Sequence, residues 1–241
     1  MRLDKAVTGF GLTRAEAKKA IAAGRVTVKG AVARDPGLHA EPGDVALDGA
    51  AAAVPGEIHI MVNKPAGVLT ATEDRRLPTV LDLLPEEVRR RGPGPVGRLD
   101  RDVTGLVLLT TDGQLAHRLI APRWKAEKVY RGVCEGRLTE ADADAFSQGM
   151  VLSDFTARPA RLTILSAEDD ASLAEVALTE GKFHQVKRMF AAVGHPLKSL
   201  ERRSIGPVCL DGALAPGQWR PLTEAETDAL YALVRLDRPG R

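Results

Sequence analysis

Asp100 lies in a polar turn, with Arg98 two positions before it and Arg101 directly after it. Residues 105–110 then form a largely apolar run, which predicts a buried strand. A turn that leads into a core strand can hold a carboxylate rigidly at the edge of a cleft, where Asp100 could act as a nucleophile or a base. The alternative is that Asp100 only forms hydrogen bonds within its own turn, as Asp commonly does.

The sequence contains none of the common motifs of metal or cofactor chemistry. Its five histidines show no HExxH or other metal-ligand spacing, and there is no Gly-Xaa-Ser-Xaa-Gly motif of a nucleophilic serine. Residues 92–97 match the GxGxxG pattern of a nucleotide-binding loop but lack its structural context. They follow a Glu- and Arg-rich segment where a nucleotide fold needs a hydrophobic strand, and no helix is predicted after them. We therefore expect no metal and no cofactor, which leaves chemistry performed by a carboxylate.

Asp100 and Asp102 together suggest one alternative chemistry. Glycoside hydrolysis uses two carboxylates at a defined separation. The separation of two side chains in a turn cannot be read from the sequence, and a sugar substrate would leave the basic N-terminal segment described below without a role. Glycoside hydrolysis is therefore the weaker hypothesis.

Three other polar side chains lie on or beside elements that could position them around Asp100. Lys64 lies in a turn that follows a predicted strand, and residues 126–134 alternate as a strand that contains Tyr130. Residues 186–193 show helical spacing of apolar side chains, with Lys187 at the border of the apolar stripe. Each of the three could also be an ordinary surface or core residue. Strands outnumber helices here, so we predict a mixed α/β (α+β) domain.

The sequence GRLDRDVTGLVLLTTDG at residues 97–113 closely resembles the active-site segment of the pseudouridine synthases, in the RsuA-type branch that modifies ribosomal RNA. This resemblance implies that Asp100 is the catalytic residue. AEKVYRG resembles the element whose tyrosine stacks on the target uracil and is a proposed participant in removal of the C5 proton, which implies that role for Tyr130. EGKFHQVKRMF resembles the motif whose basic residue pairs with the catalytic Asp, which implies that Lys187 keeps Asp100 ionised.

The same resemblance implies supporting contacts, a fold and a reaction. NKPAG resembles the motif that opens the catalytic domain, so we expect Lys64 to contact RNA or support the site, and Arg98 to be a structural or RNA contact. The family fold is a mixed, largely antiparallel sheet with the active site in a cleft across it. The reaction breaks the N1–C1′ bond of uridine and joins C5 to C1′, and the sequence does not choose between direct attack by Asp100 and a glycal intermediate. The target base must leave its stack to react.

The N-terminal segment is basic, although the whole chain has a net charge of only +2. Residues 1–30 contain seven basic and two acidic side chains. A capping box at Thr13 and Glu16 predicts a helix with a basic face, which a basic strand follows. This segment closely resembles the S4 RNA-binding domain, and aromatics are nearly absent from it (Phe10 alone), which favours recognition of RNA backbone and shape. The resemblance implies RNA contacts at Arg14, Lys18, Lys19, Arg25 and Lys29.

We expect an S4-like RNA-binding domain at residues 1–48, a linker at residues 49–55 and a pseudouridine synthase catalytic domain at residues 56–241. Residues 201–223 resemble the RsuA-type enzyme more than its large-subunit relatives. The predicted substrate is therefore 16S rRNA, or a small-subunit assembly intermediate. The alternatives are 23S rRNA and a non-catalytic RNA-binding role in ribosome assembly.

Cysteine usage and hydropathy predict the compartment. Cys134 and Cys209 are far apart and lie in no CxxC spacing, as is typical of a reducing cytoplasm. No apolar run approaches the ~18 residues of a membrane span, and the charged N-terminus does not resemble a signal peptide. We expect a cytoplasmic monomer that binds no membrane.

Overall fold

The computed structural model describes residues 1–51 and 57–238, which divide into two compact units. The first unit holds residues 1–51, 57–58 and 84–93, and the second holds the remaining described residues. The predicted linker falls mostly on residues outside the described part of the chain. Its boundaries therefore stay predictions.

The first unit packs helices against a small antiparallel sheet with the strand order β2-β1-β3-β4. Its elements are α1 (Leu3–Thr8), α2 (Arg14–Ala22), β1 (Val26–Val28), β2 (Ala31–Val32), η1 (Pro42–Asp44), β3 (Val45–Leu47), β4 (Ala50–Ala51) and α3 (Glu86–Arg90). The predicted capping box is confirmed, because Glu16 Oε2 accepts from the Thr13 amide at 2.7 Å and Thr13 Oγ1 accepts from the Glu16 amide at 3.2 Å. Apolar side chains that include Leu3, Ile21 and Val26 form the core.

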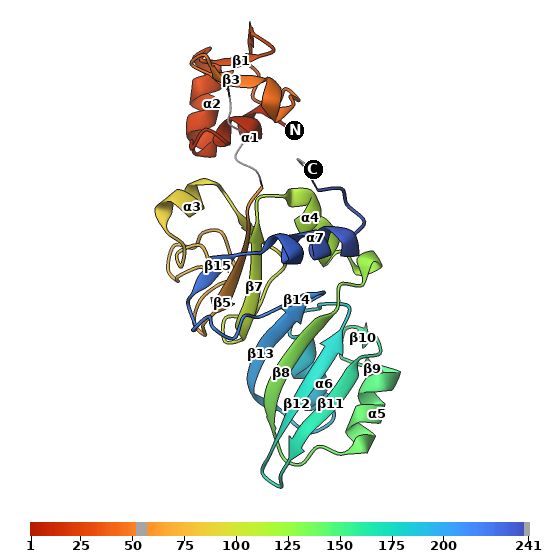
Figure 1. Cartoon of the computed structure of the whole chain (residues 1–241). Coiled ribbons are helices and arrows are strands. Elements are labelled where there is room, and N and C mark those ends of the chain that lie inside the picture. Colours follow the sequence, from red (N-terminus) through yellow and green to blue (C-terminus); the bar gives the residue numbers. More distant parts are fainter. Residues whose placement is uncertain (52–56, 239–241) are drawn as a thin grey trace. The chain divides into compact units, whose positions relative to one another are not determined.

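The second unit is built on one mixed sheet. Its strands are β5 (His59–Lys64), β6 (Gly94–Pro95), β7 (Thr104–Thr110), β8 (Lys128–Glu135), β11 (Arg161–Ala167), β12 (Ala171–Leu178), β13 (Leu197–Ile205), β14 (Val208–Cys209) and β15 (Trp219–Pro221). Among the described residues the order is β11-β12-β8-β13-β7-β5-β15, with β14 beside β13 and β6 beside β7. Strands β11, β12, β8 and β13 lie side by side in Figure 1. Only the β13–β7 pair is parallel, which confirms the predicted mixed, largely antiparallel sheet.

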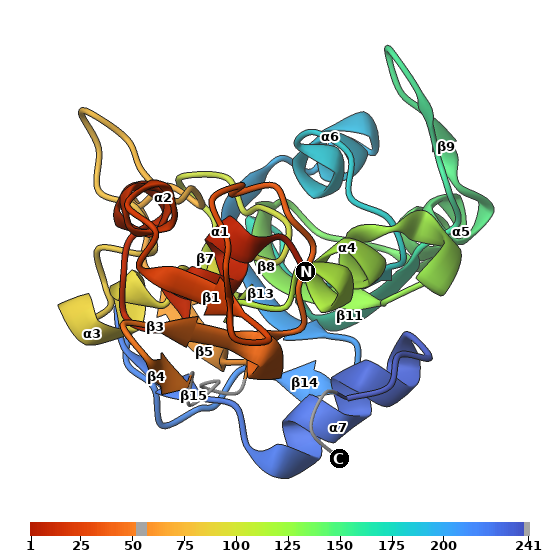
Figure 2. The same ribbon diagram turned by 90° about the horizontal axis from the view of Figure 1, so that it is seen from above.

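Helices cover parts of this sheet. They are α4 (Gly113–Ile120), η2 (Pro122–Trp124), α5 (Glu140–Gln148), α6 (Gln185–Ala192) and α7 (Glu224–Leu233). A hairpin of β9 (Met150–Val151) and β10 (Thr156–Ala157) follows α5 and projects outward (Figure 2). Asp112 caps α4 by accepting from the Gln114 and Leu115 amides at 2.8 and 3.1 Å. None of the described helices is long and apolar enough to cross a bilayer.

The predicted core strand is confirmed, because every residue from 105 to 110 is buried in β7. Leu106 and Leu108 pack in one cluster with Leu115 of α4 and Leu230 of α7. Apolar burial of this kind, at about 25 cal/mol per Å², fixes the strand that follows the Asp100 turn.

Gly105 permits the close approach of β7 to β13. Its φ is +97°, and an added Cβ would lie 2.4 Å from the carbonyl oxygen of Arg202. A side chain at this position would push the parallel strands apart. Gly105 therefore helps to hold the turn before β7 against β13.

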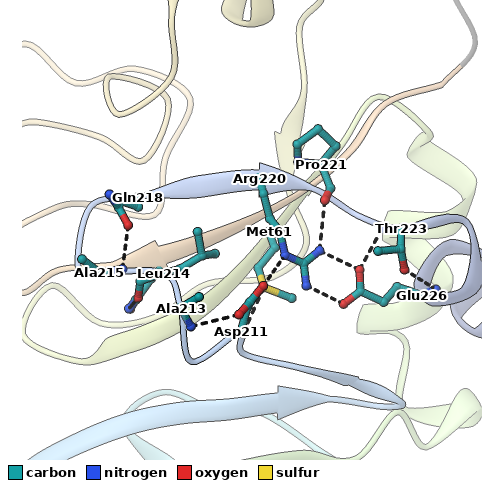
Figure 3. A network of polar contacts seen from close by, with 11 residues as sticks. Met61, Asp211, Ala213, Leu214, Ala215, Gln218, Arg220, Pro221, Thr223 and Glu226 are labelled. Carbon is teal, nitrogen blue, oxygen red and sulfur yellow. Dashed lines mark hydrogen bonds and ion pairs between the residues drawn. The ribbon is translucent and has the colours of Figure 1, made fainter.

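An ion-pair cluster centred on Arg220 ties β15 to the C-terminal helix (Figure 3). Its Nε lies 2.7 Å from Asp211 Oδ2, and its two Nη atoms each lie 2.8 Å from a different oxygen of Glu226. Glu226 also accepts from the Thr223 amide at the start of α7. The hydrogen bonds from Arg220 lower the pKa of Glu226, while the pKa of Arg220 is raised chiefly by its bonds to Glu226. The cluster is a fully partnered structural contact.

Candidate active site

Asp100, Tyr130 and Lys187 line one cavity of about 80 Å³ in the second unit. Asp100 comes from the turn before β7, Tyr130 from β8 and Lys187 from α6. The structure therefore brings together three residues that are far apart in the sequence. Their catalytic roles stay predictions.

Lys187 bridges two carboxylates of the same turn. Its Nζ lies 3.2 Å from Asp100 Oδ2 and 2.7 and 2.8 Å from the two oxygens of Asp102. Burial alone would lower the pKa of Lys187, but the hydrogen bonds to Asp102 and Asp100 raise it. The hydrogen bond from Lys187 is the main cause that lowers the pKa of Asp102. The sequence analysis missed the Asp102–Lys187 contact, although the two acids share one short turn.

This geometry argues against glycoside hydrolysis. One carboxyl of such a pair must carry a proton near neutral pH, which requires a raised pKa. The pKa of Asp102 is lowered and its carboxylate holds the same ammonium as Asp100. A cation shared by two ionised acids does not supply a general acid.

Two buried side chains fix the start of α6, which carries Lys187. Gln185 Nε2 donates to Glu180 Oε1 at 2.6 Å, and Gln185 Oε1 accepts from the Lys182 amide at 3.0 Å. Glu180 also accepts from the Arg158 amide at 2.9 Å. This network orders the loop at residues 180–185 on one side of the cavity.

His184 and Phe183 form an aromatic pair at the rim of the cavity. His184 Nε2 lies 3.6 Å from Asp100 Oδ1, and the two rings stack with centroids 3.7 Å apart. The Phe183 residue is 70% exposed. The sequence analysis assigned neither residue, although two adjacent rings in the EGKFHQVKRMF motif were a signal.

Lys64 requires a correction. It was predicted as an RNA or site-support contact, but it is completely buried at the end of β5, which continues past the predicted strand end. Its Nζ donates to the carbonyls of Pro65, Val68 and Arg101 at 2.9, 2.9 and 3.1 Å. Burial lowers the pKa of Lys64 to about 8. The burial of Lys64 contradicts a contact with RNA. Its hydrogen bonds instead support the turn that holds Asp100.

A second polar residue holds the other side of this turn. Thr70 Oγ1 donates to the Leu99 carbonyl at 2.9 Å and accepts from the Leu99 amide at 3.1 Å. With Lys64 bound at Arg101, both backbone neighbours of Asp100 are fixed. The carboxylate is thus presented by a rigid turn, as the first hypothesis required, and Arg98 is exposed beside it.

The two tyrosines have different surroundings. The Tyr231 hydroxyl donates to Asp112 Oδ2 at 2.6 Å, and its ring lies edge-on to His59. Tyr231 therefore links α7 to the start of α4. Tyr130 lines the cavity next to Asp100, and the residue is only 8% exposed.

The predicted RNA-contact residues of the first unit are partly engaged with acids. Arg14 Nε lies 3.3 Å from the buried Asp4, and Lys29 Nζ lies 3.5 Å from Asp44. Arg25 pairs with Asp48, and Lys18 and Lys19 are exposed. Across residues 1–48 the sequence holds eight basic and six acidic side chains, so the count over residues 1–30 overstated the basic field. The exposed pairs of Arg25 and Lys29 contribute little stability, so phosphates can compete for these two cations.

Relatives of known class match almost the whole chain. A family model described as RNA pseudouridylate synthase matches residues 58–192, and an S4 domain model matches residues 1–45. The RNA pseudouridine synthase YtzG of Bacillus subtilis is 42% identical, over 95% of this chain and 98% of YtzG. The ribosomal small subunit pseudouridine synthase A of Escherichia coli is 42% identical, over 94% and 98% of the two chains. A crystal structure of a pseudouridylate synthase aligns with a TM-score of 0.69 at 34% identity, over 95% and 99%.

Proposed function

Because the chain belongs to the RsuA-type RNA pseudouridine synthases with an S4 domain, we propose that it isomerises one uridine of 16S rRNA to pseudouridine. The small-subunit substrate is supported by the similarity to the Escherichia coli enzyme, whose name specifies that subunit. The reaction takes place in the cytoplasm, on rRNA or on a small-subunit assembly intermediate. All three proposed catalytic residues come from one chain, which supports activity as a monomer.

One observation supports the chemistry most directly, namely that Asp100 lies 3.2 Å from Lys187 in the cavity that Tyr130 also lines. Lys187 holds its ammonium against the Asp100 carboxylate, which is placed in the cavity to act as nucleophile or base. Tyr130 stacks on the uracil after the base has left its helix. The turn held by Lys64 and Thr70 keeps the carboxylate in place during the reaction.

RNA binding is assigned to the S4 domain and to the border of the cavity. Arg14, Lys18 and Lys19 are exposed, and Arg25 and Lys29 can exchange their acidic partners for phosphates. Arg98 is exposed at the cavity and serves as a further RNA contact.

The test is to incubate the purified protein with 16S and 23S rRNA transcripts and to map pseudouridine by carbodiimide treatment and primer extension. We expect one new stop on 16S rRNA that disappears with Asp100→Asn. Asp169→Asn is the matched control, because it makes the same chemical change at an exposed acid on the loop after β11. A stop on 23S rRNA would support the proposed reaction but would identify 23S rRNA as the substrate. No stop on either transcript or on a partly assembled small subunit would favour a binding role.

A further inference from the structure

A second cavity adjoins the first and is lined by basic side chains. It measures about 80 Å³ and shares Arg98, Tyr130 and Gly181 with the cavity that contains Asp100. Lys128 and Arg202 complete its charged lining, and its described lining residues include no acid. We call it the basic cavity.

Arg202 is a buried cation whose described surroundings leave it incompletely bonded. The residue is 2% exposed, and its Nε donates to the Leu106 carbonyl at 2.8 Å. Its guanidinium lies 6.0 Å from the centre of the Tyr130 ring. Its Nη2 is buried and has no hydrogen-bond partner among the described residues. A buried charge without a counter-ion is costly, and such groups usually have an acidic partner or a ligand.

Lys128 adds a second positive charge to the same space. Its Nζ donates to the Ala126 carbonyl at 3.0 Å, and its pKa is lowered by burial and by the nearby charge of Arg202. Two partly desolvated cations that repel one another would both gain from one bound anion. Arginine is suited to this role, because its planar fork bonds two oxygens of a phosphate.

We propose that the basic cavity binds a phosphodiester group of the RNA, next to the nucleotide whose base stacks on Tyr130. The proposal rests on the proposed function, because it places the target base in the first cavity. Tyr130 lines both cavities, so an adjacent backbone phosphate is the nearest anion that a bound RNA can supply. The exposed Arg98 and Ile120 lie in the lining and give the backbone a route from solvent. Binding there would fix the register of the target nucleotide without reading its sequence.

Neutral phosphate analogues test the proposal without altering the protein. A short RNA that spans the modified uridine is made with each flanking phosphodiester replaced in turn by an uncharged methylphosphonate. We expect one replacement to weaken binding about 10- to 100-fold, the range for a hydrogen bond to a charged group. If every replacement next to the target changes affinity less than about twofold, the proposal is wrong.

The sensitive phosphate must also depend on Arg202. In Arg202→Met the same replacement should weaken binding less than about twofold further, because its partner is already absent. Arg203→Met is the matched control, since Arg203 is the next residue in β13 and pairs with Glu201 at 3.1 Å. In Arg203→Met the methylphosphonate replacement should weaken binding by the same factor as in the unaltered protein. An equal phosphate effect in Arg202→Met and the unaltered protein would overturn the proposal and limit Arg202 to the support of Tyr130.

Ile120→Glu covers the case in which Arg202→Met does not fold. Ile120 is 50% exposed and lines the basic cavity, so a carboxylate there can occupy the cations from the surface. We expect Ile120→Glu to weaken binding of unmodified RNA and to remove the methylphosphonate effect. Ile120→Gln, which adds no charge, should retain that effect. Equal behaviour of the two variants would count against an anion site.

The salt dependence of RNA binding tests this proposal separately from the proposed function, because a binding measurement needs no turnover. For 16S rRNA, Arg202→Met should reduce the slope of log K against log salt by about 1, and Arg203→Met should not. If the slope falls in Arg202→Met but the protein forms no pseudouridine, the proposed function is rejected and the phosphate site is supported. If the slope is unchanged in Arg202→Met and the unaltered protein turns over normally, the proposed function is supported and the phosphate site is rejected. If inorganic phosphate raises the melting temperature of the unaltered protein alone, and methylphosphonate has no effect, the cavity binds free anions and the RNA assignment is wrong.

Discussion

Arg220 and Arg202 are two arginines of the same unit with opposite surroundings. Arg220 has a carboxylate on each side, and its Nε and both Nη atoms are within 2.8 Å of an acidic oxygen (Figure 3). Arg202 has a carbonyl and an aromatic ring, and its Nη2 is unbonded among the described residues. The difference is that the charge of Arg220 is neutralised within the fold, whereas Arg202 has no acidic partner among the described residues, which is the basis of the phosphate site proposed above.

The largest expected difference is between substitution of Asp100, which lies in the cavity, and substitution of Asp211, which pairs with Arg220. Asp100→Asn should reduce turnover at least about a thousandfold with little change in melting temperature, because it removes the proposed nucleophile and keeps the shape. Asp211→Asn should instead lower the melting temperature and keep turnover, because Asp211 bonds only to structural partners such as Arg220. Single-turnover assays and thermal unfolding measure the two effects. Comparable turnover in both variants would refute the assignment of Asp100.

Lys64 is an intermediate case, a buried cation bonded only to carbonyls. Because burial lowers its folded pKa from 10.5 to about 8, the unfolded chain binds more protons between these pH values. The stability of the protein should therefore rise with pH from about 8 to 10.5, by up to about 3 kcal/mol relative to Lys64→Met. Urea unfolding of both proteins across this range measures the difference. A constant difference would show that Lys64 keeps its ordinary pKa.

Substitution of each arginine by methionine tests the comparison directly. Arg220→Met should cost about 2 kcal/mol of unfolding free energy, because it leaves the oxygens of two carboxylates without their partner. Arg202→Met should cost less than about 1 kcal/mol or even stabilise, since it replaces an incompletely bonded buried charge with an apolar side chain. Chemical denaturation at neutral pH gives both values. The reverse order would mean that Arg202 is a structural residue.

Acid sensitivity gives the smallest expected effect. The pKa values of Glu226 and Asp211 are lowered in the folded protein, Glu226 chiefly by Arg220 and Asp211 by the Ala213 amide and Arg220. Their stabilisation is present above the unfolded values of 4.5 and 3.8 and is lost as pH falls through the folded ones. The stability difference between the unaltered protein and Arg220→Met should therefore shrink as the pH falls below about 4. A difference that stays constant down to pH 3 would contradict this linkage.

Local patterns in the sequence determined several elements of the fold. The capping box at Thr13 depends on residues three positions apart, and the buried strand at residues 105–110 on one continuous apolar run, so neither needs knowledge of distant partners. Asp100, Tyr130 and Lys187 were selected by motifs that are each contained in a short segment. For the capping box and the buried strand the sequence was sufficient, whereas the roles of the three site residues stay predictions.

Only the tertiary structure decided which charges are partnered. The burial of Lys64 and the sharing of Lys187 by Asp100 and Asp102 depend on which strands become neighbours. The same holds for the buried Nη2 of Arg202, which has no hydrogen-bond partner among the described residues. Strand β13 lies between β8 and β7, and this order places Arg202 opposite Tyr130 and beside Gly105. The sequence does not encode such contacts locally, because solvation and pairing of a charge are set by residues that are distant along the chain.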